Sequence, residues 1–215
     1  MGRPAKLQHD EVMKRATNLF WEKGCDAVST RDLEKALDLR APAIYRRFQS
    51  KDAFFARCVH HYVDTVIVGR LKSTFGGADD PMSALHRFFL STLEPHGRER
   101  RLRGCLLANT ATHADGQTPE VHAAIVRGWQ LIDSAFREQI ERARQAGQLD
   151  ADLDPEAVSQ ALLMSLQGLL SLVRAGITNL RPGIDATFRL LGGPPAPAPH
   201  DRVGSRASRK ARMRA

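Results

Sequence analysis

The sequence has few cysteines, few aromatic residues and no long apolar run. Its 215 residues include three cysteines, and 6% are Phe, Trp or Tyr. Three cysteines are an odd and small number for a disulfide framework, so we expect reduced thiols in a cytoplasmic protein. No run of 18 apolar residues occurs, which predicts no transmembrane helix and no membrane partner. The N-terminal residues lack the apolar segment of a signal peptide.

Enzyme motifs and strand patterns are also missing. The sequence contains no nucleophile elbow, P-loop, dinucleotide-binding fingerprint or HExxH motif, so we predict a non-enzyme without a cofactor. The histidines lack a metal-ligand spacing, and the adjacent His60 and His61 cannot share one helical face, so we predict no metal. Helical periodicity recurs from residue 10 to residue 191, which predicts an all-α protein of about nine helices.

The net charge of +8 is concentrated at the two ends of the chain. Residues 1–51 hold 11 Lys or Arg against 7 Asp or Glu, and residues 192–215 hold 6 against 1. The middle of the chain is close to neutral. This distribution indicates a polyanionic partner for the N-terminal part, although basic charge also serves solubility alone.

Capping residues and glycines mark the expected helix boundaries. We expect the first helix over residues 10–23, with Gly24 ending it, and a long helix from Lys51 to about Thr74. Three dipeptides place a capping side chain before a first-turn proline, and each predicts a helix start: Asp80-Pro81, Thr118-Pro119 and Asp154-Pro155. A shorter helix is expected over residues 104–114 and a last one over residues 182–191.

Residues 29–51 predict two short helices joined by a tight turn. Ser29 or Thr30 caps the first, and Asp32 can complete a capping box from Ser29. The turn falls at Asp38-Leu39, and the next helix runs over about residues 41–48. A short apolar helix, a tight turn and a helix with basic residues form the arrangement that places a helix in the DNA major groove.

The first 65 or so residues resemble the DNA-binding domain of the TetR family of bacterial transcriptional regulators. The resemblance rests on the arm Gly2-Arg3-Pro4, on the segments ATNLFWEKG and DLEKAL, and above all on Ile44-Tyr45-Arg46-Arg47-Phe48-Gln49-Ser50-Lys51. It implies a flexible arm over 1–9, a helix-turn-helix domain over 10–67 and a helical ligand-binding and dimerisation domain over 68–191. Residues 192–215, rich in Pro, Ala and Arg, are expected to be a disordered basic tail.

The candidate DNA-binding residues lie on the arm, at two helix starts and on the third helix. They are Arg3, Thr30, Arg40, Ala41, Pro42, Ala43, Tyr45, Arg46 and Lys51. Thr30 and Lys51 stand at helix N-termini, which favour phosphate, and the resemblance gives both a role on the DNA backbone. One of Arg46 and Arg47 is expected in the groove, where arginine binds guanine with two hydrogen bonds, and the other on the DNA backbone. Arg3 either reaches the minor groove or is a frayed terminus.

The chain departs from the family pattern in the turn and at the start of the third helix. Asp38 replaces the usual glycine, but aspartate tolerates left-handed backbone better than most residues. Arg40 replaces the usual Ser or Thr cap, and Ala41-Pro42-Ala43 offers little hydrogen bonding to bases. We therefore expect base readout to rest on Arg40, Tyr45 and Arg46.

The candidate ligand-binding residues of the second domain are polar or aromatic residues among apolar positions. They are His86, Phe89, Asn109, His113, Trp129 and Gln167. For each histidine, a surface position or a satisfied core position is the competing interpretation. Cys105 stands at a helix start after several arginines, which favours a reactive thiolate and a redox sensor. The competing interpretation is a small buried hydrophobic residue.

The segment VSQALLMSLQGLLSLVRAG is apolar nearly all round, which predicts a homodimer through the last two helices. Such a dimer binds a palindromic operator. The predicted function is a repressor released from DNA by an unknown small-molecule inducer. The long fourth helix is expected to transmit the effect of the inducer from the second domain to the DNA-binding domain. The alternatives are a redox-sensing repressor, a non-specific architectural DNA binder, an activator and a regulator that binds a partner protein.

Overall fold

The computed structural model describes residues 9–94, 103–112 and 117–192, and within these ranges it consists of helices and loops without a strand. The predicted all-α fold is therefore confirmed. Helices α4 and α5 are joined by a π-helical segment into one continuous rod, so the described residues form nine separate helical rods. Arg3, His113 and residues 193–215 of the predicted tail lie outside the described residues.

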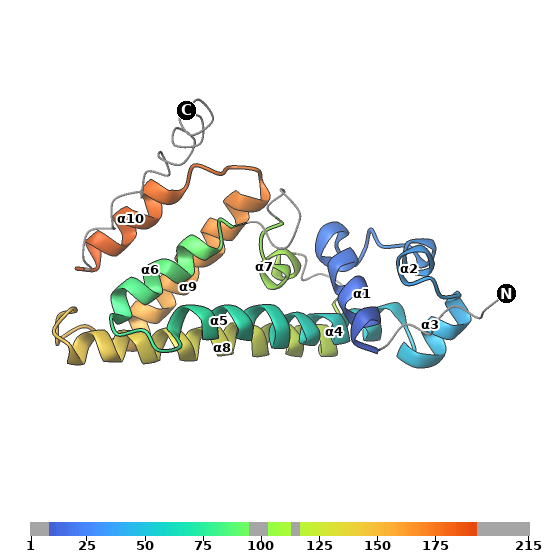
Figure 1. Cartoon of the computed structure of the whole chain (residues 1–215), viewed down its shortest axis with the longest axis horizontal. Coiled ribbons are helices and arrows are strands. Elements are labelled where there is room, and N and C mark those ends of the chain that lie inside the picture. The colour runs from blue at the N-terminus through green and yellow to red at the C-terminus, as the bar shows by residue number, and fades with distance from the viewer. Residues whose placement is uncertain (1–8, 95–102, 113–116, 193–215) are drawn as a thin grey trace, which may run out of the picture.

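Three helices form the N-terminal part. They are α1 (His9–Lys23), α2 (Thr30–Leu37) and α3 (Ala41–Phe48). Gly24, with a φ of +83°, takes the left-handed backbone that ends α1. These bounds agree with the predicted ones to within one residue, and Figure 1 shows the three helices gathered at one end of the molecule.

A long rod connects this part to the rest of the molecule. It consists of α4 (Lys51–Tyr62), the π-helical segment η1 (Val63–Ile67) and α5 (Val68–Phe75). Ser50 caps it, because its Oγ accepts a hydrogen bond from the Ala53 amide at 3.1 Å. The predicted long helix is confirmed, but the sequence did not indicate the π-helical turn. The rod packs against α1 at its start and then runs alongside α8 (Figure 1).

Five more helices complete the chain. They are α6 (Pro81–Ser91), α7 (Leu106–Ala111), α8 (Pro119–Gln145), α9 (Pro155–Arg174) and α10 (Arg181–Leu190). Asp80, Thr118 and Asp154 each accept a hydrogen bond from a first-turn amide, as their position before proline predicts. α7 begins two residues later than the predicted start at Gly104.

One apolar core runs through both parts of the molecule. Phe20 of α1 packs at 5.0 Å from Phe55 of α4, between ring centroids. Further along, Phe88 of α6 meets Phe136 of α8 at 5.1 Å in an edge-to-face contact. The rod contributes to this core at both ends, through Phe54 and Phe55 of α4 and through Leu71 and Phe75 of α5.

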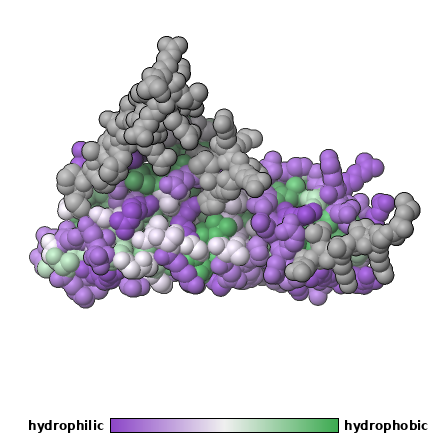
Figure 2. Space-filling view, in the orientation of Figure 1, coloured by the Kyte–Doolittle hydropathy of each residue, from purple (hydrophilic) through white to green (hydrophobic). Residues whose placement is uncertain are grey.

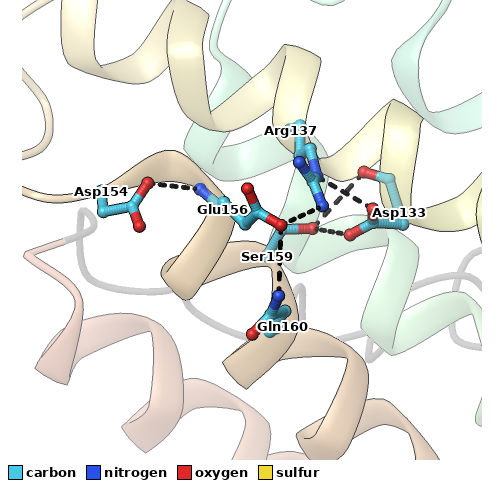
Figure 3. A network of polar contacts seen from close by, with 6 residues as sticks. All are labelled: Asp133, Arg137, Asp154, Glu156, Ser159 and Gln160. Atoms are coloured by element: carbon cyan, nitrogen blue, oxygen red, sulfur yellow. Dashed lines mark hydrogen bonds and ion pairs between the residues drawn. The ribbon is translucent and has the colours of Figure 1, made fainter.

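Helix α9 is the one helix of the described residues that is long and apolar enough to cross a membrane, with a mean hydropathy of 1.3. Core helices meet the same criterion, and α9 is bound to α8 by polar contacts (Figure 3). The buried Ser159 donates to Asp133 Oδ1 at 2.6 Å, and Arg137 pairs with Asp133 at 2.9 Å and with Glu156 at 3.1 Å. We therefore interpret α9 as a core helix with one uncovered face.

Candidate nucleic-acid interface

The turn between α2 and α3 is fixed by local hydrogen bonds. Ser29 caps α2 and forms the predicted capping box with Asp32. Asp32 Oδ1 also accepts from Lys23 Nζ at 2.6 Å, and the Lys23 and Ser29 hydrogen bonds hold the pKa of the Asp32 carboxyl well below its usual range. Asp38 adopts left-handed backbone at φ 52° and ψ 41° as the C-cap of α2. The turn therefore forms without the glycine usual in the family.

Apolar side chains fix the angle between these helices. Leu33, Leu37, Ile44 and Phe48 are completely buried. The Phe48 ring stacks on Phe54 of α4 with 3.8 Å between centroids. These contacts pack α3 against α2 and against the start of the rod.

The N-terminus of α3 is capped from the neighbouring helix. Arg40 holds the N-cap position, but its side chain makes no capping hydrogen bond. Instead, Glu34 of α2 accepts a hydrogen bond from the Ala41 amide at 2.8 Å. Pro42 has no amide hydrogen to satisfy, and the Ala43 amide donates to the Arg40 carbonyl at 2.9 Å. Sequence reasoning missed this role of Glu34, although an acid on α2 and a missing cap on α3 were both visible.

The outward face of α3 is basic. Arg40, Pro42, Arg46 and Arg47 are exposed, whereas Ala41, Ala43 and Tyr45 are half-buried. Arg47 contacts the His9 ring nitrogen Nδ1 and lies over the Phe48 ring, 5.5 Å from its centroid. Arg47 is thus held against the protein, which leaves Arg40 and Arg46 as the more outward-reaching guanidinium groups. The space-filling view shows mainly hydrophilic residues over this end of the molecule (Figure 2).

The starts of α2 and α4 lie near α3. Thr30 stands at the first, Lys51 at the second, and Tyr45 on α3 itself. The Thr30 and Tyr45 hydroxyls form a hydrogen bond of 2.9 Å, so the structure brings these two predicted DNA-binding residues together. Lys51 is half-buried, and its Nζ donates to the Val28 carbonyl oxygen at 3.4 Å. The DNA roles of the candidate residues remain predictions, but all those in the described ranges, Thr30 to Lys51, belong to one unit.

The predicted ligand-binding residues are separated in the structure. His86 of α6 is buried and its Nε2 lies 2.7 Å from Asp185 Oδ1 of α10, which agrees with the satisfied-core interpretation. Phe89 packs between Phe136, at 5.9 Å, and Phe188, at 5.3 Å. Both side chains are engaged in contacts between helices.

A cleft of about 540 Å³ lies where the N-terminal part meets the other helices. Asn109 lines it, whereas His86, Phe89, Trp129 and Gln167 do not. Its walls include the end of α1, residues 24–27, the start of α4, α7 and the end of α9. Sequence reasoning missed this cleft, because its walls come from segments far apart in the chain.

Cys105 is the N-cap of α7, so the helix start predicted there is close to the observed one. Its side chain is 3% exposed, and the fully buried Tyr62 hydroxyl donates to the Cys105 sulfur at 3.4 Å. Burial, and then the neighbouring Cys105, raise the pKa of Tyr62. The buried thiol fits the interpretation as a small packed residue better than that as an accessible sensor. Within the described ranges, no cluster of three or more His, Cys, Asp or Glu has the arrangement of a metal site.

Two family profiles match the chain, one in each part. Residues 12–58 match "Bacterial regulatory proteins, tetR family", and residues 81–178 match "Tetracyclin repressor-like, C-terminal domain". These matches cover the helix-turn-helix and most of the helices after α5. Both parts therefore point to the same family.

Curated relatives and solved structures agree with these matches. The transcriptional repressor ComR of Escherichia coli is 22% identical over 81% of this chain and 83% of its own length. The transcriptional regulator AcuR of Cereibacter sphaeroides is 26% identical, covering 84% of each chain. A cysteine-substituted form of the TetR family regulator CifR, solved with 26-bp operator DNA, has a TM-score of 0.71 and 25% identity over 89% of this chain and 98% of that one.

The E. coli regulator NemR in its reduced form has a TM-score of 0.75 over 85% of this chain and 95% of its own, and at 15% identity it supports the fold alone. Both profiles and these relatives indicate one family, whose members have a helix-turn-helix at the N-terminal end. The basic α3 lies within that region of this chain. The chain belongs to the TetR family of DNA-binding transcriptional regulators.

Proposed function

We propose that this protein is a homodimeric repressor that binds a palindromic operator through α3 and is released by a small-molecule inducer. The observation that carries the proposal is the capped, rigidly packed α3 with Arg40 and Arg46 exposed on its outer face. A helix presented in this way enters the major groove, where arginine discriminates guanine. The repressor ComR and the operator complex of CifR support the same reading for a relative and for a structural neighbour.

Separate residues are assigned to base readout and to backbone contacts. Arg40 and Arg46 read bases, and the alanines at 41 and 43 contact thymine methyl groups. The hydroxyl groups of Thr30 and Tyr45, which already share a hydrogen bond, bind a phosphate together with Lys51. For Lys51, DNA binding exchanges the 3.4 Å hydrogen bond to the Val28 carbonyl for a phosphate contact.

The second copy of the chain covers the outer face of α9 and α10. Met164 is 70% exposed and Leu172 is 42% exposed on α9, and Leu190 of α10 is 88% exposed. Ala161 and Gly168 are also exposed on α9, and their small side chains allow a second helix to approach closely. Large apolar side chains left in water in this number are typical of an interface.

The continuous rod α4–η1–α5 transmits the inducer signal. α3 is locked to its beginning by the Phe48–Phe54 stack, and its far end lies among the helices that follow. The inducer binds more tightly to the conformation in which the α3 helices are displaced than to the conformation that fits the operator. At saturation, it lowers operator affinity by the ratio of its affinities for these two conformations.

Replacement of one exposed arginine of α3 tests the base-readout assignment. Arg46→Ala is expected to weaken operator binding by about 10- to 100-fold and to relax the sequence preference at one base pair in each half-site. The matched control is Arg87→Ala on α6, an exposed arginine outside both the helix-turn-helix and the proposed dimer interface. Equal losses of affinity for specific and random DNA in the Arg46 variant would contradict base readout.

A further inference from the structure

A cleft lies between the DNA reader, by which we mean α1, α2, α3 and the start of α4, and the other helices. It has the size and composition of a ligand site. Its volume of about 540 Å³ falls within the range of small-molecule pockets, about 300–1,000 Å³. The reader contributes Phe20, Trp21 and Phe55 to the lining, and the other helices contribute Leu106 and Val121. Hydrogen-bonding groups such as Thr110 and Ser171 add to this apolar lining.

The two basic side chains of the cleft are already engaged. Lys23 Nζ lies 2.6 Å from Asp32 Oδ1 in the capping network of α2. Arg174 donates to the Glu22 carbonyl oxygen at 3.3 Å and so connects α9 to α1. Their charges are therefore directed to partners within the protein.

The two acidic side chains of the cleft are not neutralised in this way. Asp26 and Asp52 are exposed, and neither takes part in an ion pair among the described residues. Asp52 Oδ1 accepts a hydrogen bond from the Cys25 thiol, with 3.9 Å between the two atoms. Burial, more than the opposing effect of Lys51, raises the pKa of Cys25 to about 11, so the thiol stays neutral. The Lys51 ammonium donates to the Val28 carbonyl oxygen instead.

We propose that this cleft binds an amphipathic amine, a molecule with an apolar body and one protonated nitrogen. The body lies along the apolar lining of the cleft, beside Trp21, and the ammonium group is held by Asp26 and Asp52. As the effector of the repressor, a role that rests on the proposed function above, such a molecule would bridge the two walls. The reader and α9 would then be held at one spacing, because each contributes one side of the site.

Fluorine NMR of protein labelled with 5-fluorotryptophan tests the site directly. The chain has two tryptophans: Trp21 lines the cleft, and Trp129 on α8 lies outside it and serves as an internal reference. A Trp129→Phe variant assigns the two signals. Titration with 4-phenylbutylamine is expected to shift the Trp21 signal saturably and to leave the Trp129 signal in place. The matched carboxylate, 4-phenylbutyrate, is expected to give no saturable shift.

Removal of the acids separates charge recognition from apolar binding. The double variant Asp26→Asn and Asp52→Asn is expected to bind the amine at least about tenfold more weakly. A control with Glu120→Gln and Glu138→Gln, two exposed acids of α8 outside the cleft, should bind as the unaltered protein does. Equal binding of amine and carboxylate, a shift of both tryptophans, or an unchanged affinity in the double variant would overturn the proposal.

The regulatory role has its own readout. The amine titration is made without DNA, so its result stands whether or not the protein proves to be a repressor. Operator affinity is then measured with and without saturating 4-phenylbutylamine. A lower affinity supports the effector role, whereas amine binding at Trp21 with unchanged operator affinity would overturn that role. Failure to select any operator counts against the proposed function and leaves the site assignment unaffected.

Discussion

At the residue scale, the start of α3 depends on a side chain of the preceding helix. Glu34 supplies the acceptor that Arg40 cannot provide, at 2.8 Å from the Ala41 amide. The sequence predicted the bounds of α3 correctly but gave it no cap. A capping side chain seven positions away depends on the packing angle of two helices, and that angle is set by buried residues of both.

Glu34→Ala is expected to lower stability by about 1 kcal/mol, the typical value of a lost N-cap, and to weaken operator binding. The reason is that the Ala41 amide loses its partner. In an Arg40→Ser background, serine supplies its own cap, and the same Glu34→Ala change should then have little effect on stability. Thermal unfolding of the four proteins measures this coupling. An equal loss in both backgrounds would show that Glu34 acts in some other way.

Asp32 makes the stability of α2 depend on pH. The pKa of Asp32 is lowered in the folded protein, chiefly by the hydrogen bond from Lys23, so its carboxylate stabilises the fold when ionised. This contribution is fully present above the unfolded pKa of about 3.9 and is lost as the pH falls through the lower folded value. The difference in melting temperature between the unaltered protein and Asp32→Asn should therefore shrink below pH of about 4. A difference that stays constant down to pH of about 2 would contradict the assignment.

At the element scale, most helices could be predicted because their ends are marked by neighbouring residues. Ser29 and Asp32, Asp80 before Pro81 and Thr118 before Pro119 form caps within four residues of each other, and the structure contains all of them. The π-helical segment Val63–Ile67 and the cleft could not be predicted in this way. The π-helical segment lies against α8, and the walls of the cleft come from α1, α4, α7 and α9, so no local sequence pattern records either feature.

Gly128 allows α8 to pack closely against both the rod and α7. A Cβ atom there would lie 2.5 Å from Leu107 Cδ1 and 3.0 Å from Val63 Cγ2, both side chains fully buried. Gly128→Ala is therefore expected to destabilise the fold by about 1–3 kcal/mol. Gly69→Ala on α5, where a Cβ meets nothing within 4 Å, should stabilise it by about 0.5–1 kcal/mol. Chemical denaturation compares the two; a stabilised Gly128 variant would show that the packing yields easily.

At the scale of the whole molecule, the proposed dimer rests on the uncovered face of α9. Met164→Glu places a charge at the centre of the proposed interface and should raise the dimer dissociation constant on the order of 10- to 100-fold. Val126→Glu on α8, at a position 37% exposed in the monomer, is the matched control and should leave the dimer intact. Sedimentation over a range of concentrations measures both. A monomeric unaltered protein, or dissociation only in the control, would place the interface elsewhere.

The central claim is that a dimer of this chain reads a specific DNA sequence through α3. Selection of bound fragments from a random double-stranded library, at fixed salt, tests it most directly. The account predicts one palindromic motif with half-sites about one helical turn apart, and loss of that motif with Arg46→Ala. Binding that falls steeply with salt and enriches no sequence would contradict it.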